Sequence, residues 1–202
     1  ILFENIREVR PTFLTAVPRI FEKIHAKILD SVASMTGVKR KLADWSIAVG
    51  LQTVPYRQRS QDLPFMLGLK YKIADKLVLN KFRAALGGKV RACSSGGSAL
   101  SKEVGSFFCG IGITIIEGYG LTETSPVMTV GHSDFFKFGT VGKPIPGVEV
   151  KIQPDGEIVC RGHNVMMGYY KNEEATNEAI IDGWFHSGDI GEFDEDGLLR
   201  IT

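Results

Sequence analysis

The chain has 202 residues, is 44% hydrophobic, and carries 24 basic against 23 acidic residues, which gives a net charge of +1. A chain of this length and composition can bury a real core as one domain or two lobes. The near balance of charge gives no support to nucleic-acid binding. No apolar run approaches the ~20 residues of a membrane span, and no signal peptide opens the sequence.

The three cysteines, Cys93, Cys109 and Cys160, lie far apart, are odd in number and form no CxxC pair. They predict reduced thiols in a cytoplasmic protein rather than a disulfide framework or a metal site. The chain starts at Ile1 without a methionine and stops at Thr202 inside an expected strand. We therefore expect an excised piece of a larger protein.

The first part of the chain predicts an α/β arrangement. A buried strand is expected over residues 12–17, and Pro18 then suits the first position of a helix. Phe21 lies on the apolar stripe of that helix, one turn past the strand end. It is either a core residue or a residue that points into a ligand tunnel. His25 is expected on the helix surface.

Residues 36–87 predict a helical insertion. One helix is expected to end near Gly50, followed by a loop over residues 52–62 and a second helical region that Pro64 opens. The basic cluster at residues 39–41 is interpreted as a solvated face, with contact to membrane phospholipid or CoA phosphates as the weaker alternative.

Two glycine-rich stretches follow expected strands. Residues 90–94 lead into Ser94-Ser95-Gly96-Gly97-Ser98, and the apolar residues 111–116 lead into Gly118-Tyr119-Gly120. One helix, with Ser101 as its N-cap, separates the two strands. A βαβ unit of this size places both strand ends on one edge of a sheet, where open α/β sheets bind ligands.

The second stretch combines three residue types in a row. Glycines on both sides of Tyr119 allow close approach of backbone to a ligand, and the tyrosine ring offers a face for stacking. Thr122 and Glu123 supply the hydroxyl and carboxylate that a phosphate and its magnesium ion require. The alternative interpretation is a tight turn that binds nothing.

From about residue 132 the pattern predicts strands and turns, with hairpins over 148–160 and 190–201. Asp189 follows a glycine at an expected strand start, where a carboxylate can accept both hydroxyls of a ribose. The alternative is a turn aspartate. His186 is interpreted as structural, because no nucleophile signature or HExxH spacing surrounds it.

Together these stretches resemble the adenylate-forming acyl-CoA synthetase family, the AMP-forming ligases. The most diagnostic match is Gly118 through Glu123, and residues 95–100, 139–144, 168–171 and 187–189 follow in the family's order. Residues 182–202 resemble the fatty acyl-CoA synthetase signature, and the helical insertion resembles the long-chain subgroup. Ser98, Ala99 and Ser187 depart from the commonest family residues without removing a needed functional group.

The resemblance implies a long-chain fatty acid:CoA ligase that uses ATP, Mg²⁺ and CoA. It implies that Glu123 holds the metal and Thr122 contacts phosphate, these two being the catalytic candidates. It implies that Tyr119 stacks on adenine and Asp189 grips the ribose. The remaining candidates border the nucleotide or the acyl group: Gly96, Gly97, Ser98, Gly118, Gly120, Leu121 and, for the acyl tunnel, Phe21.

The implied fold is part of the large domain of such an enzyme. We expect an α/β parallel-sheet lobe over residues 1–131, with flanking helices and the insertion 36–87, and a smaller β-rich lobe over residues 132–202. The family's phosphate loop and its C-terminal lobe with the adenylation lysine would lie outside this chain, so the fragment alone is expected to be inactive.

Three questions stay open at this level. The parent enzyme acts on a fatty acid or, alternatively, on an aryl, amino or luciferin-like acid. A second alternative is that the protein is not an enzyme but a nucleotide-binding module without catalytic activity. A cytoplasmic location is expected, with peripheral contact at the inner face of the membrane as an addition. The sequence gives neither chain-length preference nor oligomeric state.

Overall fold

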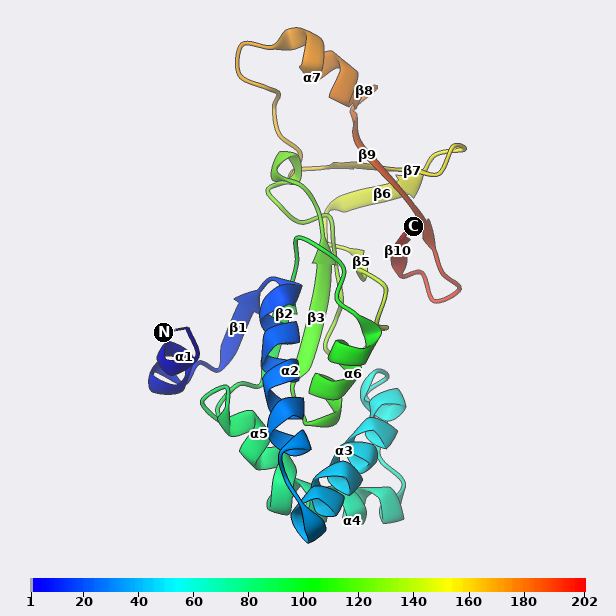
Figure 1. The fold of residues 1–202 in the computed structure, drawn as a ribbon. Coiled ribbons are helices and arrows are strands. Elements are labelled where there is room, and N and C mark those ends of the chain that lie inside the picture. Colours follow the sequence, from blue (N-terminus) through cyan, green and yellow to red (C-terminus); the bar gives the residue numbers. More distant parts are fainter. Residues whose placement is uncertain (1) are drawn as a thin grey trace. The chain divides into compact units, whose positions relative to one another are not determined.

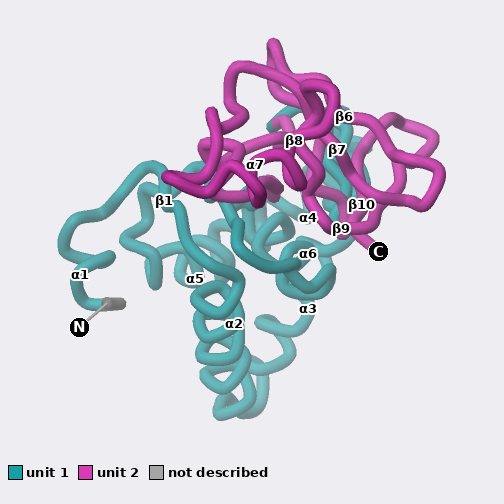
Figure 2. Tube along the Cα trace, turned by 90° about the horizontal axis from the view of Figure 1, so that it is seen from above, with its two compact units in different colours: residues 1–116, 133–138 teal, residues 117–132, 139–202 magenta. Residues whose placement is uncertain are grey.

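The computed structural model describes residues 2–202 and divides into two compact units (Figure 2). Unit 1 comprises Ile1–Ile116 and Ser133–Phe138, and unit 2 comprises Glu117–His132 and Gly139–Thr202. This division falls earlier than the lobe boundary expected at residue 131. The reason is that the end of strand β3 pairs with β4, since Gly118 lies opposite Val130, and this ladder belongs to unit 2.

Unit 1 holds helices around a short parallel sheet (Figure 1). Its strands follow the order β1-β2-β3, and β1 and β2 are parallel with Phe13 opposite Ala92. The elements are α1 (Leu2–Val9), β1 (Phe13–Ala16), α2 (Pro18–Ala33), α3 (Gly37–Arg57), α4 (Phe65–Ala74), the π-helical turn η1 (Asp75–Leu79), α5 (Asn80–Ala84), β2 (Ala92–Ser95), α6 (Lys102–Gly110) and the first half of β3 (Thr114–Tyr119).

The core of unit 1 lies where α2, α3 and α6 meet, and Figure 1 shows α2 and α6 side by side. Phe21 of α2 packs edge-on against Phe108 of α6, with ring centroids 5.7 Å apart. Such paired rings add about 0.5–1.5 kcal/mol to the hydrophobic burial of each side chain. Ser101 caps α6 as expected, since its hydroxyl accepts a hydrogen bond from the Val104 amide at 3.2 Å.

Helix α3 corrects one expectation, because it continues through Gly50 to Arg57 where a loop was predicted. Gly50 does not end the helix. It lets α3 approach α6, since a Cβ at Gly50 would lie 2.7 Å from the carbonyl oxygen of Gly110. The glycine therefore serves helix packing. Pro55 in the last turn has no N–H to donate to the carbonyl four residues before it, so α3 lacks one intrahelical hydrogen bond there.

His25 also differs from its expected place, because its side chain is buried, with its ring 4.5 Å from that of Phe107. Burial lowers the pKa of His25 from its ordinary value near 6.5, and the carboxylate of Glu103 opposes this only in part. Neutral His25 therefore suits the folded state, while the unfolded chain takes up a proton more readily.

We expect this histidine to make unit 1 less stable in acid. Its contribution to folding is fully present above pH 6.5 and is lost as the pH falls through that value toward the lowered pKa. The variant His25→Phe should unfold with a shallower pH dependence between pH 5 and 7 in urea titrations. An unchanged dependence would show that another group carries the acid sensitivity.

Unit 2 is built mainly from antiparallel strands. One sheet has the order β10-β9-β7-β6 with β8 also paired to β9, and β3, β4 and β5 pair in sequence. The elements after β3 are the 3₁₀ turn η2 (Thr122–Thr124), β4 (Thr129–Val130), β5 (Lys143–Pro144), β6 (Val148–Ile152), β7 (Glu157–Gly162), α7 (Glu173–Ala179), β8 (Ile180–Ile181), β9 (Trp184–Phe193) and β10 (Leu199–Ile201).

Both expected hairpins of unit 2 form, since β6 pairs with β7 and β9 pairs with β10. Asn172 caps α7 by accepting a hydrogen bond from the Ala175 amide at 3.1 Å. Strand β9 starts earlier than expected, so that Asp189 lies inside the strand rather than at its start.

The three cysteines are free thiols, as the sequence predicts, and all three are buried. Burial raises the pKa of Cys109 and Cys160 to about 11, so both are neutral thiols at physiological pH. Within the part of the chain that the structure describes, no helix combines the length and apolar character that crossing a membrane requires.

Candidate functional site

The structure brings Tyr119 and Asp189 together, although 70 residues separate them in the sequence. The Tyr119 hydroxyl donates a hydrogen bond of 2.6 Å to Oδ2 of Asp189. Burial, followed by this bond to the carboxylate, raises the pKa of Tyr119, so its hydroxyl stays protonated as a donor. Two residues expected to hold adenine and ribose therefore lie in direct contact within unit 2.

A bulge in β9 places Asp189. Glu157 of β7 lies opposite Ile190, whereas Val159 lies opposite His186, so β9 carries two extra residues in this interval. Gly188 takes a φ of +74°, a conformation that a residue with a Cβ rarely adopts. Bulges of this kind redirect a side chain and recur beside binding sites.

Side chains take over the hydrogen bonds that the bulge removes from the ladder. The Ser187 hydroxyl donates to the Ile158 carbonyl at 2.6 Å and accepts from the Asp189 amide at 3.1 Å. The carboxylate of Glu157 accepts from the Gly188 amide at 2.9 Å and lies 2.6 Å from Nδ1 of His186. His186 thus has a partner that supports the bulge, in agreement with the structural role expected for it.

Tyr119 ends β3 and leads directly into the turn that carries Thr122 and Glu123. Thr124 closes this turn, because its buried hydroxyl bonds both the amide and the carbonyl of Leu121 at 2.9 Å. The Thr122 side chain is exposed, whereas that of Glu123 is half-buried.

The two glycines beside Tyr119 occupy their positions for different structural reasons. Gly118 lies within β3, where the sequence predicted a turn, and pairs with Val130. At Gly120, a Cβ would lie only 1.9 Å from the carbonyl oxygen of Pro126. The close approach of the Pro126 backbone therefore requires glycine at position 120, independently of any ligand.

A second tyrosine contacts Glu123. The Tyr169 hydroxyl donates a hydrogen bond of 2.9 Å to Oε1 of Glu123, across 46 residues of sequence. This bond raises the pKa of Tyr169, so the phenol remains a donor at neutral pH. The segment 168–171 is part of the family resemblance in the sequence, which implies no separate role for Tyr169.

Gly96, Gly97 and Ser98 form a separate turn in unit 1, directly after β2. Gly97 has a φ of +83°, which favours glycine, whereas a Cβ at Gly96 would meet no atom within 4 Å. The hydroxyl of the preceding Ser95 is buried without a hydrogen-bond partner. Space at Gly96 and a buried polar atom next to it fit a turn that receives a polar ligand.

Phe21 is fully buried in the core of unit 1, where it packs on Phe108. This position corresponds to the packing alternative that the sequence left open.

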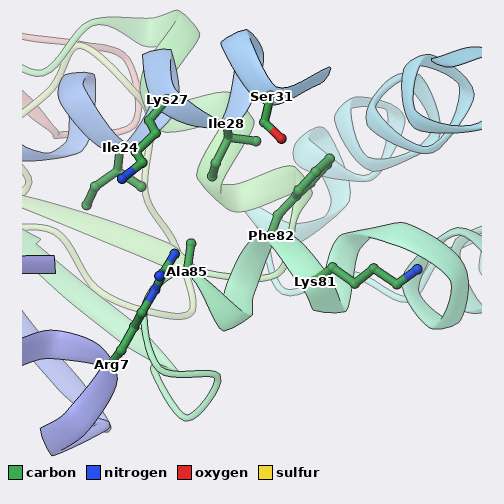
Figure 3. A pocket seen from close by; sticks show the side chains of 8 residues that line it. All are labelled: Arg7, Ile24, Lys27, Ile28, Ser31, Lys81, Phe82 and Ala85. Carbon is green, nitrogen blue, oxygen red and sulfur yellow. The ribbon is translucent and has the colours of Figure 1, made fainter. Parts of the chain in front are cut away.

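Unit 1 also has a cavity of about 240 Å³ away from the predicted site residues, none of which line it (Figure 3). Arg7 and Lys27 extend toward the same end of this cavity, whereas Lys81 points away from it. The lining residues are Arg7, Ile24, Lys27, Ile28, Ser31, Lys81, Phe82 and Ala85.

The residues of unit 2 fit a magnesium–nucleotide pair better than a protein-bound metal. Among the described residues, no group of three or more His, Cys, Asp or Glu side chains could hold an ion alone. Mg²⁺ that binds with a nucleotide needs only one or two carboxylates, because phosphates and water complete its shell. Glu123 suits this, since Tyr169 engages Oε1 and leaves Oε2 outside that bond.

Sequence reasoning missed the groups that support the predicted residues, above all Tyr169, Glu157 and the hydroxyl of Ser187. Their partners lie 29 to 46 residues away, so no local pattern reports these contacts. The Gly168-Tyr169 dipeptide was the one local sequence pattern that pointed to any of these supporting groups.

Comparison with known proteins gives a consistent result. The profile of the family described as AMP-binding enzyme matches residues 1–170. The long-chain-fatty-acid–CoA ligase FadD15 of Mycobacterium bovis is 43% identical over 196 residues, which cover 96% of this chain and 32% of that protein. The long-chain-fatty-acid–CoA ligase ACSBG2 of Xenopus laevis is 40% identical over 98% of this chain and 27% of its own length.

Among solved structures, a malonyl-CoA ligase in a ternary product complex with methylmalonyl-CoA and AMP has a TM-score of 0.61 at 28% identity. The match covers 98% of this chain and 35% of that structure. The chain thus spans about a third of the length of the curated relatives named above. The α/β fold class, as part of a larger adenylate-forming domain, is confirmed.

Proposed function

Because the chain belongs to the AMP-binding enzyme family, we propose that the protein containing it is a long-chain fatty acid:CoA ligase. It joins a fatty acid to ATP, giving an acyl-adenylate and pyrophosphate, and then transfers the acyl group to the thiol of CoA with release of AMP. The names of relatives at 40–43% identity over nearly the whole chain support the fatty acid as substrate.

The contact between Tyr119 and Asp189 carries the proposal. A tyrosine ring and a carboxylate at 2.6 Å present a stacking face beside an acceptor for ribose hydroxyls. When a nucleotide binds, the ribose hydroxyls take the place of the tyrosine hydroxyl at Asp189. Thr122 and Glu123 follow Tyr119 within four residues, so phosphate and cation contacts adjoin the nucleoside contacts.

The reaction needs no catalytic base, because a fatty carboxylate is already ionised at neutral pH. Its difficulty is electrostatic, since an anion must approach the α-phosphate of a triphosphate. Mg²⁺ supplies positive charge to the phosphates when it is bound. The protein's part is to hold the groups in line, with Glu123 toward the cation, Thr122 on phosphate, and Gly118, Gly120 and Leu121 at the acyl and phosphate positions.

Replacing Glu123 with glutamine tests this assignment. We expect Glu123→Gln in the full-length protein to lower the rate of fatty-acid-dependent pyrophosphate release by roughly a hundredfold or more, because the cation loses its charged protein ligand. Glu195→Gln, which changes an exposed carboxylate in the same unit, is the control and should keep the rate. Equal rates for Glu123→Gln and Glu195→Gln would refute the metal role.

The acid substrate is tested separately. A panel of long-chain, short-chain and aryl acids, assayed by pyrophosphate release, should show its highest kcat/KM with long-chain acids. A preference for aryl or short acids would transfer the proposal to another adenylating ligase, such as the malonyl-CoA ligase that shares the fold. Residues 1–202 alone are expected to release no pyrophosphate, since they span about a third of the relatives' length.

A further inference from the structure

Tyr169 is the described residue whose side chain holds the carboxylate of Glu123. Its hydroxyl donates to Oε1 at 2.9 Å, and the half-buried Glu123 side chain sits in the short turn after β3. A free glutamate has three rotatable side-chain bonds and loses entropy when a ligand orders it. A hydrogen bond that already fixes one oxygen reduces the ordering that remains when the other oxygen binds a ligand.

The same segment also holds the backbone of Glu123. The Met166 amide donates to the Glu123 carbonyl at 2.7 Å, three residues before Tyr169. Backbone and side chain of Glu123 are therefore attached to one stretch of chain, residues 166–169. Any movement of this stretch would move the carboxylate with it.

The stretch is itself fastened to the start of α7. The Thr176 hydroxyl accepts from the Tyr169 amide at 2.9 Å and donates to the Asn172 carbonyl at 2.7 Å. Gly168 has a φ of +149°, and a Cβ there would lie 2.8 Å from Cγ2 of Thr176. Glycine at this position lets the chain pass close to α7, and the tyrosine is presented from a fixed backbone.

We propose that Tyr169 is a positioning residue for Glu123, holding Oε1 so that Oε2 faces the cation of a magnesium–nucleotide complex. The inference rests on the metal role given to Glu123 in the proposed function. It adds a residue that touches neither nucleotide nor acid, and that acts through the carboxylate alone.

The test removes only the hydroxyl of Tyr169. Tyr169→Phe in the full-length protein should raise the Mg²⁺ concentration for half-maximal pyrophosphate release by roughly three- to tenfold, the range for losing one typical hydrogen bond. It should also weaken Mn²⁺ binding in the presence of a non-hydrolysable ATP analogue, measured as free Mn²⁺ by electron paramagnetic resonance. The thermal midpoint without ligands should stay that of the unmodified protein.

Tyr170→Phe is the matched control, because it removes the hydroxyl of the adjacent tyrosine, which is 87% exposed. It should leave both measurements unchanged. In a double-mutant cycle, Tyr169→Phe should add nothing further to Glu123→Gln, because the tyrosine acts through that carboxylate.

The outcomes separate the two proposals. If Glu123→Gln weakens cation binding while Tyr169→Phe behaves like Tyr170→Phe, the positioning role is overturned and the proposed function stands. If the effects of Tyr169→Phe and Glu123→Gln simply add, the positioning role is likewise overturned. If Glu123→Gln changes neither the Mg²⁺ dependence nor the rate, the metal role fails and the positioning role fails with it.

Discussion

Replacing Gly120 with alanine is expected to abolish fatty acid activation and to destabilise unit 2 by roughly 3 kcal/mol or more, the upper part of the range for forcing atoms into a filled space. The added Cβ would lie 1.9 Å from the carbonyl oxygen of Pro126 and 2.9 Å from the amide nitrogen of Met128. Neither neighbour is the flexible end of a side chain, so the backbone itself must shift.

That shift would reach the candidate site directly. The Met128 amide donates to the Tyr119 carbonyl at 2.8 Å, and Met128 is fully buried in the core of unit 2. Moving this pair displaces Tyr119, and with it the hydroxyl that contacts Asp189. Urea unfolding and pyrophosphate release of the full-length Gly120→Ala variant measure the two effects.

Gly96 provides the contrasting glycine. A Cβ at Gly96 would meet nothing within 4 Å, so Gly96→Ala should leave the unfolding free energy within about 0.5 kcal/mol of the original. If adenine occupies the open space, the same variant raises the KM for ATP. A Gly120→Ala variant as stable as Gly96→Ala would contradict the steric argument for Gly120.

The contrast shows how far a motif can be interpreted from sequence. The sequence predicted a strand followed by a turn near Gly118 to Glu123, and β3 does lead into the turn Thr122–Thr124, because this is a local pattern. It could not distinguish a glycine that a ligand needs from one that the backbone needs. Gly118 proved to be a paired strand residue and Gly120 a site of contact with Pro126, and both facts depend on residues further along the chain.

Helix ends were predicted well where one residue determines them. Ser101 caps α6 through its own side chain, and Pro18 opens α2 as expected. The end of α3 was predicted wrongly because a glycine is ambiguous, and at Gly50 packing against Gly110 outweighs its weak helix propensity. His25 was misplaced for a similar reason, since only the tertiary fold covers it with Phe107.

The candidate site residues likewise show a difference between what local sequence indicates and what the tertiary fold determines. The Gly188-Asp189 dipeptide made Asp189 a candidate, but its placement depends on a bulge in β9. Glu157 stabilises this bulge from β7, and Ser187 stabilises it from within. Those supporting contacts join residues distant in sequence, or depend on the strand register. Sequence thus proposes candidate ligand-binding groups, and the fold reveals the groups that hold those candidates in place.

For Phe21, a role in core packing and a role in substrate selection predict different results when the ring is removed. We expect Phe21→Ala to lower the unfolding free energy by about 3–5 kcal/mol, the usual cost of removing a buried phenylalanine ring. Phe21 is fully buried, and its ring meets that of Phe108 at 5.7 Å and an interplanar angle of 75°. Phe65→Ala is the control, because this ring at the start of α4 is 83% exposed and its loss should cost little.

The substrate measurement decides whether Phe21 does more than pack. The ratio of kcat/KM between a long and a medium-chain acid is compared for the full-length protein and its Phe21→Ala variant, at a temperature where both are folded. A ratio that stays constant while the unfolding free energy falls assigns Phe21 to the core alone and overturns its proposed place in the acyl tunnel. A shift of the kcat/KM ratio toward longer acids, with the Phe65→Ala ratio unchanged, would mean that the acyl chain enters the space left by the ring. A cavity closed to substrate would not change the preference for chain length.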